Sequence, residues 1–267
     1  MLDLIAVSER IDRKTEFPRL VARAATIAGI DASDPELEQK IAKRAANEAA
    51  EREREERART AALLKMPDVW SSLARRSSAG KAYLATRGFE DDELRTQGDV
   101  VRYSDAGEVA LAMRSLETGA VVGIQYRSII GKGFRAEPYS EPSSSALGGR
   151  IAELDREGVD VAIVVEGLSD TLAARLAWPG CAVFGAAGVD HVEAVMEAVA
   201  ARAVEIGGWV LLVVDDDEVG IEAGADAIGA AVDAGLVLDR TLHVVDVGNH
   251  HDLADAYAAG WRWSWPS

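Results

Sequence analysis

The chain has 267 residues, 48% of them apolar, which suits one large domain or two modest ones with a real core. A net charge of −16 argues against nucleic-acid binding by bulk charge, but leaves open binding through a local basic groove or bound metal ions. The single cysteine excludes a disulfide framework or a multi-cysteine zinc ribbon, and no apolar run approaches the roughly 18 residues that span a bilayer.

The first 66 residues are expected to form a helical region. Residues 1–30 carry apolar positions at helical spacing, and their charged start is unlike a secretory signal, so we expect a cytoplasmic protein. A long helix should follow from Pro35 to Leu64, with Asp34 as its cap. Its middle is nearly all Glu, Arg and Ala, which favours a solvated linker helix with i,i+4 ion pairs. A partner-binding arm is the alternative.

Residues 67–150 are expected to form a smaller α+β subdomain. The segment "SAGKAYLATRGF" predicts a helix that ends at Gly88. The segment "VALAMRSLETGAVVGIQYRSI" predicts a β-hairpin with its turn at "LETGA". The Ser/Pro/Gly-rich segment "EPYSEPSSSALGG", residues 137–149, predicts a loop.

Residues 151–267 alternate between short apolar strands and helices. The expected strands are "VDVAIVVEG", "CAVFGA", "WVLLVV" and "TLHVVDV". A helix should follow each one, and Ser169 or Asp170 should cap the first of these helices. Strands that are apolar on both faces and alternate with helices indicate a mostly parallel sheet flanked by helices, an α/β fold. Cys181, at the start of the second strand, is expected to be an inert core thiol.

Acidic residues follow three of these strands, where ligands bind in open α/β sheets. Glu166 ends the first strand, Asp215, Asp216 and Asp217 follow the third, and Asp252 and Asp255 follow the fourth. In extended backbone, Asp215 and Asp217 point the same way and could share a ligand with Glu166. Closely placed carboxylates select Mg²⁺ or Mn²⁺. The alternative is that these residues only cap helices and satisfy turns.

The acidic pattern resembles the toprim domain of DnaG-type primases, topoisomerases and related nucleases. In that family a strand ends in Glu-Gly with an Asp three residues after the Gly, and a later strand ends in Asp-x-Asp-x-x-Gly. The family's small-residue turn is matched at Gly185 in "FGAAG", and its Asp-x-x-Asp motif in "HDLADAY". The positions that match the two strand motifs are Glu166, Gly167, Asp170, Asp215, Asp217 and Gly220.

Two upstream segments resemble primases rather than topoisomerases or OLD-type nucleases. "AYLATRGF" resembles a primase segment in which a Tyr-Leu pair precedes Arg-Gly, and "GAVVGIQYRSIIGKGFR" resembles a hairpin that delivers Arg and Lys to the toprim face. The resemblance covers roughly residues 77–258. It implies that Arg87, Arg127, Lys132 and, more weakly, Arg135 contact the nucleotide or the template.

The resemblance implies a DNA primase, a nucleotidyltransferase of DNA replication that makes short RNA primers on single-stranded DNA by two-metal nucleotidyl transfer. Glu166, Asp215 and Asp217 would be catalytic and would hold Mg²⁺ or Mn²⁺. Asp252 and Asp255 would hold a second metal or orient the site, supported by Gly167, Asp170 and Gly220. The expected partners are single-stranded DNA, ribonucleoside triphosphates and either a replicative helicase or a separate zinc-ribbon chain.

Several departures from the primase pattern leave alternatives open. Ile221 and Glu222 stand where primases usually carry basic residues, and His250 and His251 stand where a basic residue is usual. No zinc is expected within this chain and no P-loop motif occurs, which favours a phage or mobile-element primase. The alternatives are a toprim-family metal-dependent nuclease and a catalytically silent toprim module that binds a replication partner.

Overall fold

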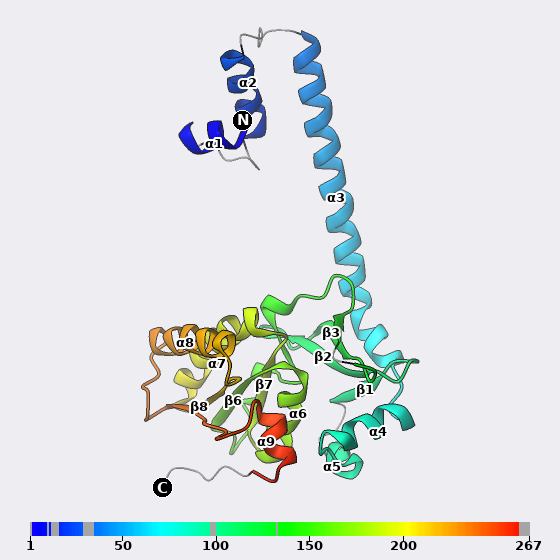
Figure 1. The fold of residues 1–267 in the computed structure, drawn as a ribbon, viewed down its shortest axis with the longest axis vertical. Helices are drawn as coiled ribbons and strands as arrows, with labels where there is room; N and C mark the ends of the chain where they lie inside the picture. The colour runs from blue at the N-terminus through cyan, green and yellow to red at the C-terminus, as the bar shows by residue number, and fades with distance from the viewer. Residues whose placement is uncertain are drawn as a thin grey trace. The chain divides into compact units, whose positions relative to one another are not determined.

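In the computed structural model, the chain forms two compact units, residues 1–61 and residues 62–267 (Figure 1). It describes residues 2–9, 11, 16–28, 35–96, 100–131 and 133–261. The expected cap Asp34 and the expected ligand-binding Lys132 therefore lie outside the described residues. Within the described ranges, no helix combines the length and the apolar character needed to cross a membrane.

The first unit contains the helices α1 (Leu2–Glu9) and α2 (Phe17–Ile27) and most of α3 (Pro35–Ser72). A small apolar cluster packs α1 against α2 and comprises Ile5, Ala6, Ile11 and Leu20. From residue 39 to residue 61, nearly all side chains of α3 are partly or fully exposed. Arg44 pairs with Glu48 and Arg57 with Glu53 at i,i+4 spacing, as predicted for a solvated helix.

The helix α3 continues to Ser72, so its predicted end at Leu64 is wrong. Pro67 lies inside the helix with its ring exposed to solvent. Met66 and Trp70 on either side of it are buried, with 1% and 4% exposure, against one face of the strands that follow. Burial of two large side chains offsets the roughly 3 kcal/mol that an internal proline costs, so the helix persists.

Two short helices, α4 (Ser78–Thr86) and α5 (Asp91–Thr96), precede the sheet. Ser77 caps α4 by accepting a hydrogen bond from the Gly80 amide at 3.1 Å. The predicted stop at Gly88 is confirmed, because this residue has φ of +79°, a left-handed conformation that favours glycine. A Cβ at Gly88 would also lie 2.8 Å from the Ala258 backbone, so glycine permits a close approach to the C-terminal helix.

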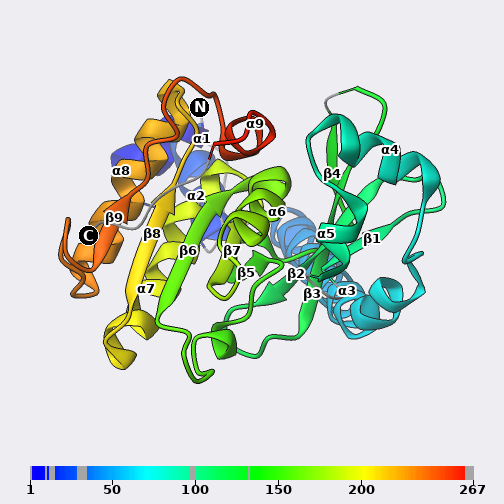
Figure 2. The same cartoon turned by 90° about the horizontal axis from the view of Figure 1, so that it is seen from below.

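One sheet, with nine strands among the described residues, forms the body of the second unit (Figure 2). Its order is β4-β3-β2-β5-β7-β6-β8-β9, and β1 pairs with β2 off this path. Strands β1 to β5 pair antiparallel, which confirms the predicted β2–β3 hairpin, whereas β7, β6, β8 and β9 are parallel. The strands are β1 (Val101–Tyr103), β2 (Val109–Ser115), β3 (Val121–Arg127), β4 (Phe134–Ala136), β5 (Ser145–Leu147), β6 (Val161–Glu166), β7 (Ala182–Ala186), β8 (Trp209–Val213) and β9 (Leu242–Val244).

The strand β5 joins the antiparallel and parallel parts of the sheet. A loop was predicted for residues 137–149, and this prediction is wrong at Ser145–Leu147, whose three residues are all buried. β5 pairs with β2 on one side, and Leu147 pairs with Gly185 of β7 on the other. A Ser-rich segment becomes a strand here because neighbours on both sides offer backbone hydrogen bonds, which overrides weak local propensity.

Helices cover both faces of the parallel strands. On β6, Ile163 and Val165 pack with α6 and α9, whereas Ala162 and Val164 pack with α7 and α8. Figure 2 shows α6 and α9 together on one side of the sheet. This arrangement confirms the predicted mixed α/β architecture with a parallel, two-sided part. The four helices are α6 (Gly167–Ala177), α7 (Val192–Ile206), α8 (Glu218–Asp233) and α9 (Leu253–Ala258).

Candidate functional site

The carboxyl ends of β6 and β8 place acidic residues at the same edge of the sheet. β6 ends at Glu166, and β8 ends two residues before Asp215. The two strands are parallel neighbours, with Val165 opposite Val213, so Glu166 and Asp215 leave the sheet next to each other. The sequence predicted this proximity from two apolar runs that each stop at an acid.

Glu166 and Asp215 are partly buried and repel the acids around them. Burial, then the charges of Asp215, Asp217 and Asp190, raises the pKa of Glu166 to about 7. Burial, then the charges of Asp252, Asp217 and Asp255, raises the pKa of Asp215 to about 6, although the nearby His251 lowers it. The acids expected to act together therefore share one electrostatic environment.

Asp217 and Asp252 also cap helices. Asp217 precedes α8, and its Oδ1 accepts a hydrogen bond from the Gly220 amide at 2.8 Å. Asp252 precedes α9 and accepts one from the Asp255 amide at 2.6 Å. Each cap stabilises its helix by about 1 kcal/mol. Asp217 and Asp252 therefore do cap helices, as the alternative interpretation predicted. The second oxygen of each carboxylate takes no part in the cap.

Two glycines shape the turns that present the acids. Gly167 begins α6 with φ of +74°, so the chain turns from strand to helix immediately after Glu166. A Cβ on Gly220 would lie 2.5 Å from the Asp215 carbonyl oxygen, so only glycine allows α8 to approach the end of β8 this closely.

Asp170 does not cap its own helix, and neither does Ser169. The helix α6 begins at Gly167, and both residues lie in its first turn, because the left-handed glycine starts the helix directly after the strand. The Asp170 side chain is buried and accepts a hydrogen bond from the Ala254 amide at 2.7 Å, which ties α6 to the start of α9. Burial, then the charges of Asp252 and Asp215, raises the pKa of Asp170 well above its usual value.

Arg87 is paired with the acids of α9. Its Nη2 lies 3.6 Å from Oδ2 of Asp252 and 3.3 Å from Oδ1 of Asp255. Its Nε is buried and has no hydrogen-bond partner in the described part of the chain. The sequence assigned Arg87 to the nucleotide or template and the two aspartates to a metal, whereas the structure brings all three together.

The other basic candidates differ in their surroundings. The Arg127 Nε donates to the Tyr83 hydroxyl at 2.9 Å, and its guanidinium lies 4.2 Å from the centre of the Phe134 ring. Arg135 instead pairs with Glu108 and lies over the ring of Tyr126 at 3.7 Å. This pairing lowers the pKa of Glu108. Arg135 is therefore engaged on the β3–β4 surface.

A cavity of about 440 Å³ brings several of these groups together. Asp217, Asp255, Gly220 and Arg135 do not line it. Gln125 does, although no sequence motif points to it. Its Nε2 donates to the Ala187 carbonyl at 3.0 Å, and its Oε1 is buried without a partner among the described residues. The alternation that turns Arg127 toward the cavity predicts the same for Gln125, two residues earlier on β3. The cavity is lined by Arg87, Gln125, Arg127, Phe134, Glu166, Gly167, Leu168, Ser169, Asp170, Ala187, Gly188, Val189, Asp215 and Asp252.

The acids of this edge have the chemistry of a divalent-metal site. Carboxylate oxygens are the ligands that Mg²⁺ and Mn²⁺ prefer, and the raised pKa values of Glu166 and Asp215 reflect burial and then repulsion among the acids, which a cation would relieve. Across the described ranges, no three His, Cys, Asp or Glu side chains already form a compact metal-binding group. Asp190 adds negative charge near Glu166, and no sequence motif points to it, because it lies in the short 3-10 helix Val189–His191 after β7 and follows no acidic motif.

Comparison with known proteins finds similar structures but no similar sequences. No protein-family model and no curated protein matches the chain. The DnaG catalytic core is 15% identical with a TM-score of 0.51, and the match covers 72% of this chain and 74% of that chain. The DnaG primase catalytic domain bound to single-stranded DNA gives the same identity and TM-score, with 74% of each chain covered.

The RNA polymerase domain of Mycobacterium tuberculosis primase DnaG, in complex with double-stranded DNA, is 19% identical with a TM-score of 0.46. That match covers 77% of this chain and 78% of that chain. At such low identities, a structural match is informative about the fold alone. Over 72% of its length, the chain has the fold of a DnaG-type primase catalytic core.

Proposed function

We propose that this chain is the catalytic core of a toprim-type DNA primase, which joins ribonucleotides into short RNA primers on single-stranded DNA. The observation that carries the proposal is the pair of mutually repelling acids, Glu166 and Asp215, in a cavity that also contains Arg87 and Arg127. Acids and guanidiniums in one cavity are what a site for metal-bound triphosphate requires. The DnaG-type fold supports the same proposal.

Glu166, Asp215 and Asp217 would hold Mg²⁺ or Mn²⁺. When bound, the metal would neutralise charge on the triphosphate and lower the pKa of the attacking 3′-hydroxyl. Asp217 is suited to this role because its cap fixes the carboxylate while one oxygen remains outside the cap. Asp252 and Asp255 orient Arg87 in this conformation, and a second cation at these acids would have to displace that guanidinium.

The remaining groups of the cavity would bind the nucleotide. Arg127 is held between Tyr83 and Phe134, so its guanidinium is oriented before a phosphate arrives. Gln125 would help to shape the cavity, since its Nε2 donates to the Ala187 carbonyl and ties β3 to the segment after β7. The template is proposed to be single-stranded DNA, with a replicative helicase or a separate zinc-ribbon chain as partner.

The test is de novo synthesis from labelled ribonucleotides on single-stranded DNA, with Mg²⁺, with Mn²⁺ and with neither. Short metal-dependent products are expected from the wild type. They should be lost in Glu166→Gln and Asp215→Asn, which remove one charge each and little volume. The matched control is Asp216→Asn, because this neighbouring carboxylate is exposed and does not line the cavity.

The proposal is wrong if Glu166→Gln and Asp215→Asn retain full synthesis while remaining folded by circular dichroism. A degraded template with no product would assign the same acids to a toprim nuclease. An intact template with no product, with and without a helicase, would indicate a silent module.

A further inference from the structure

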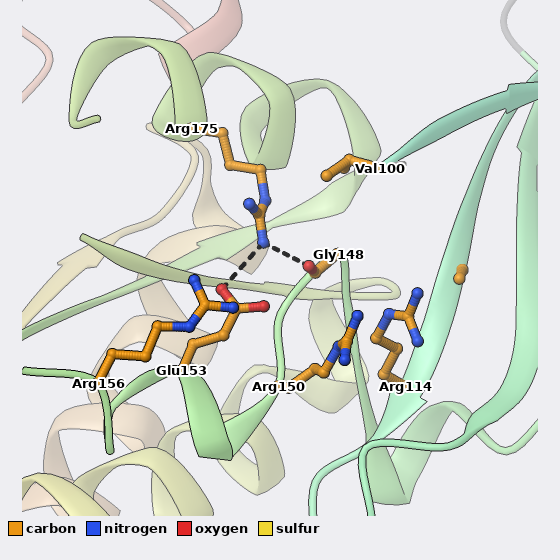
Figure 3. A pocket seen from close by; sticks show the side chains of 8 residues that line it. Val100, Arg114, Gly148, Arg150, Glu153, Arg156 and Arg175 are labelled. Carbon is orange, nitrogen blue, oxygen red and sulfur yellow. Dashed lines mark hydrogen bonds and ion pairs between the residues drawn. The ribbon is translucent and has the colours of Figure 1, made fainter. Parts of the chain in front are cut away.

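A second pocket, of about 230 Å³, is lined by four arginines, Arg114, Arg150, Arg156 and Arg175. We call it the arginine pocket. Figure 3 shows these side chains directed to one pocket from α6, from β2 and from the segment between β5 and β6. Such a concentration of positive charge is unexpected in a chain with a net charge of −16, and none of these four residues lines the acidic cavity.

The arginine pocket and the acidic cavity lie at opposite ends of α6. Gly167, which lines the acidic cavity, is the first residue of this helix, whereas Arg175 lies in its last turn. At 1.5 Å per residue, the two positions are about 12 Å apart along the helix axis. Arg150 and Arg156 precede β6, so they lie on the side of its amino end, while Glu166 is at its carboxyl end. The arginine pocket is therefore a separate site.

Arg175 lies at the base of the pocket and is nearly buried. Its side chain is 11% exposed, and its Nη2 donates to the Gly148 carbonyl and, at 3.3 Å, to Glu153 Oε2 (Figure 3). Its Nε is buried and has no hydrogen-bond partner within the described ranges. Burial lowers the pKa of Arg175, and the nearby charges of Arg156 and Arg150 add to this effect, although Glu153 opposes it.

Arginines outnumber carboxylates among the described residues that line the pocket. Within that described lining, Glu153 is the one carboxylate, and it is already paired with Arg175. The guanidiniums of Arg150 and Arg156 lie close enough to Arg175 to disfavour its charged form. An anion would relieve this repulsion.

We propose that the arginine pocket binds the diphosphate group of a small ligand, either free pyrophosphate or the phosphate end of a nucleotide. Planar guanidiniums match phosphate oxygens in pairs, and several of them together select a polyvalent anion over chloride. A diphosphate carries about three negative charges, so several guanidiniums can pair with it at once. The pocket has room for such a group, because its volume of about 230 Å³ far exceeds the roughly 10–15 Å³ that one water molecule needs.

The pocket shape favours a small ligand over a nucleic-acid strand. A strand is bound along a row of surface cations, each facing one singly charged phosphate. Here the four cations surround one small volume, and Arg175 at its base is nearly buried. The proposal does not depend on primase activity, since it concerns binding at a separate site.

The test is isothermal titration calorimetry of the full chain with pyrophosphate. The buffer contains EDTA, so that no divalent metal can recruit phosphate to the acidic cavity. The variants are Arg150→Gln and Arg156→Gln, both of which alter exposed side chains and should fold. Arg240→Gln, an exposed arginine outside the pocket, makes the same charge change and is the matched control. ATP, inorganic phosphate and a single-stranded oligonucleotide are titrated in parallel.

One-to-one binding of pyrophosphate is expected, weakened about tenfold or more by Arg150→Gln and by Arg156→Gln and unchanged by Arg240→Gln. Similar behaviour with ATP would identify a nucleotide as the source of the diphosphate, whereas binding of pyrophosphate alone would identify the free anion. The absence of pyrophosphate binding, or equal binding by all variants, would overturn the proposal. The proposal would also be overturned if the arginine variants weakened binding of the oligonucleotide alone, because the arginines would then contact a nucleic-acid strand.

Discussion

Replacing Asp217 by Ser and by Ala separates its capping role from its proposed metal-binding role. Serine keeps an oxygen that caps α8, whereas alanine removes it. Asp217→Ala should therefore lose about 1 kcal/mol of folding free energy, which lowers Tm by roughly 2–4 °C in a domain of this size. The loss should be slightly smaller than for an isolated cap, because Asp217 also repels Glu166. Asp217→Ser should melt close to the wild type.

Both variants should lose metal-dependent synthesis by about 100-fold or more, because neither retains a carboxylate. Tm comes from thermal melts followed by circular dichroism, and activity from the primer-synthesis gel with Mg²⁺. Asp216→Ser is the matched control and should leave both quantities unchanged, since its side chain is exposed outside the cavity. Full synthesis by Asp217→Ser would show that Asp217 is only a cap. Equal destabilisation by Ser and Ala would show that the cap does not account for its stability effect.

Three further predictions concern pH, backbone space and the core. Without metal, Glu166→Gln should be more stable than the wild type at about pH 8 and should lose this advantage near pH 4. The reason is that a carboxyl whose pKa is raised by folding destabilises the fold once it is deprotonated. Mg²⁺ should accordingly raise the wild-type Tm more at about pH 8 than at about pH 5. Gly220→Ala should lower the free energy of unfolding, measured in urea, by about 1–3 kcal/mol and should reduce synthesis, because the new Cβ would meet the Asp215 carbonyl. Gly229→Ala on the same helix is the control, and it should be neutral or stabilising because the space around Gly229 is open. Trp70→Ala should cost about 3–5 kcal/mol by the same measurement, and a loss under 1 kcal/mol would contradict the packing of α3 on the sheet.

The parallel part of the fold was predictable because its signals are local. Each strand is a short apolar run, and two of them stop at an acid or just before one, β6 at Glu166 and β8 two residues before Asp215. Glu166 and Asp215 could be placed at one edge because parallel strands end at the same edge. The end of the helix at Gly88 was predictable for a similar reason, since a glycine after a helical pattern predicts that the helix ends there in a left-handed conformation.

The features that were not predictable depend on residues far apart in the chain. Ser145–Leu147 becomes a strand only because β2 and β7 lie on either side of it. Arg87 pairs with Asp252 and Asp255, and no spacing rule relates residues so distant in sequence. The continuation of α3 past Pro67 likewise depends on a sheet face that covers Trp70.

A helix-capping role does not exclude the proposed metal-binding role for the aspartates of this fold. Three helices, α6, α8 and α9, begin at the acidic edge, and the amino end of a helix carries a partial positive charge of roughly half an elementary charge. Asp217 and Asp252 interact with two of these ends as caps, and Asp170 accepts a hydrogen bond from the first turn of α9. These contacts compensate part of the repulsion among the acids and fix their orientation without a cation. Glu166 and Asp215 make no such cap, although both line the cavity, and burial together with nearby acids raises their pKa values to about 7 and about 6. A bound cation would therefore stabilise most directly the charged forms of the pair that is proposed to meet the metal first.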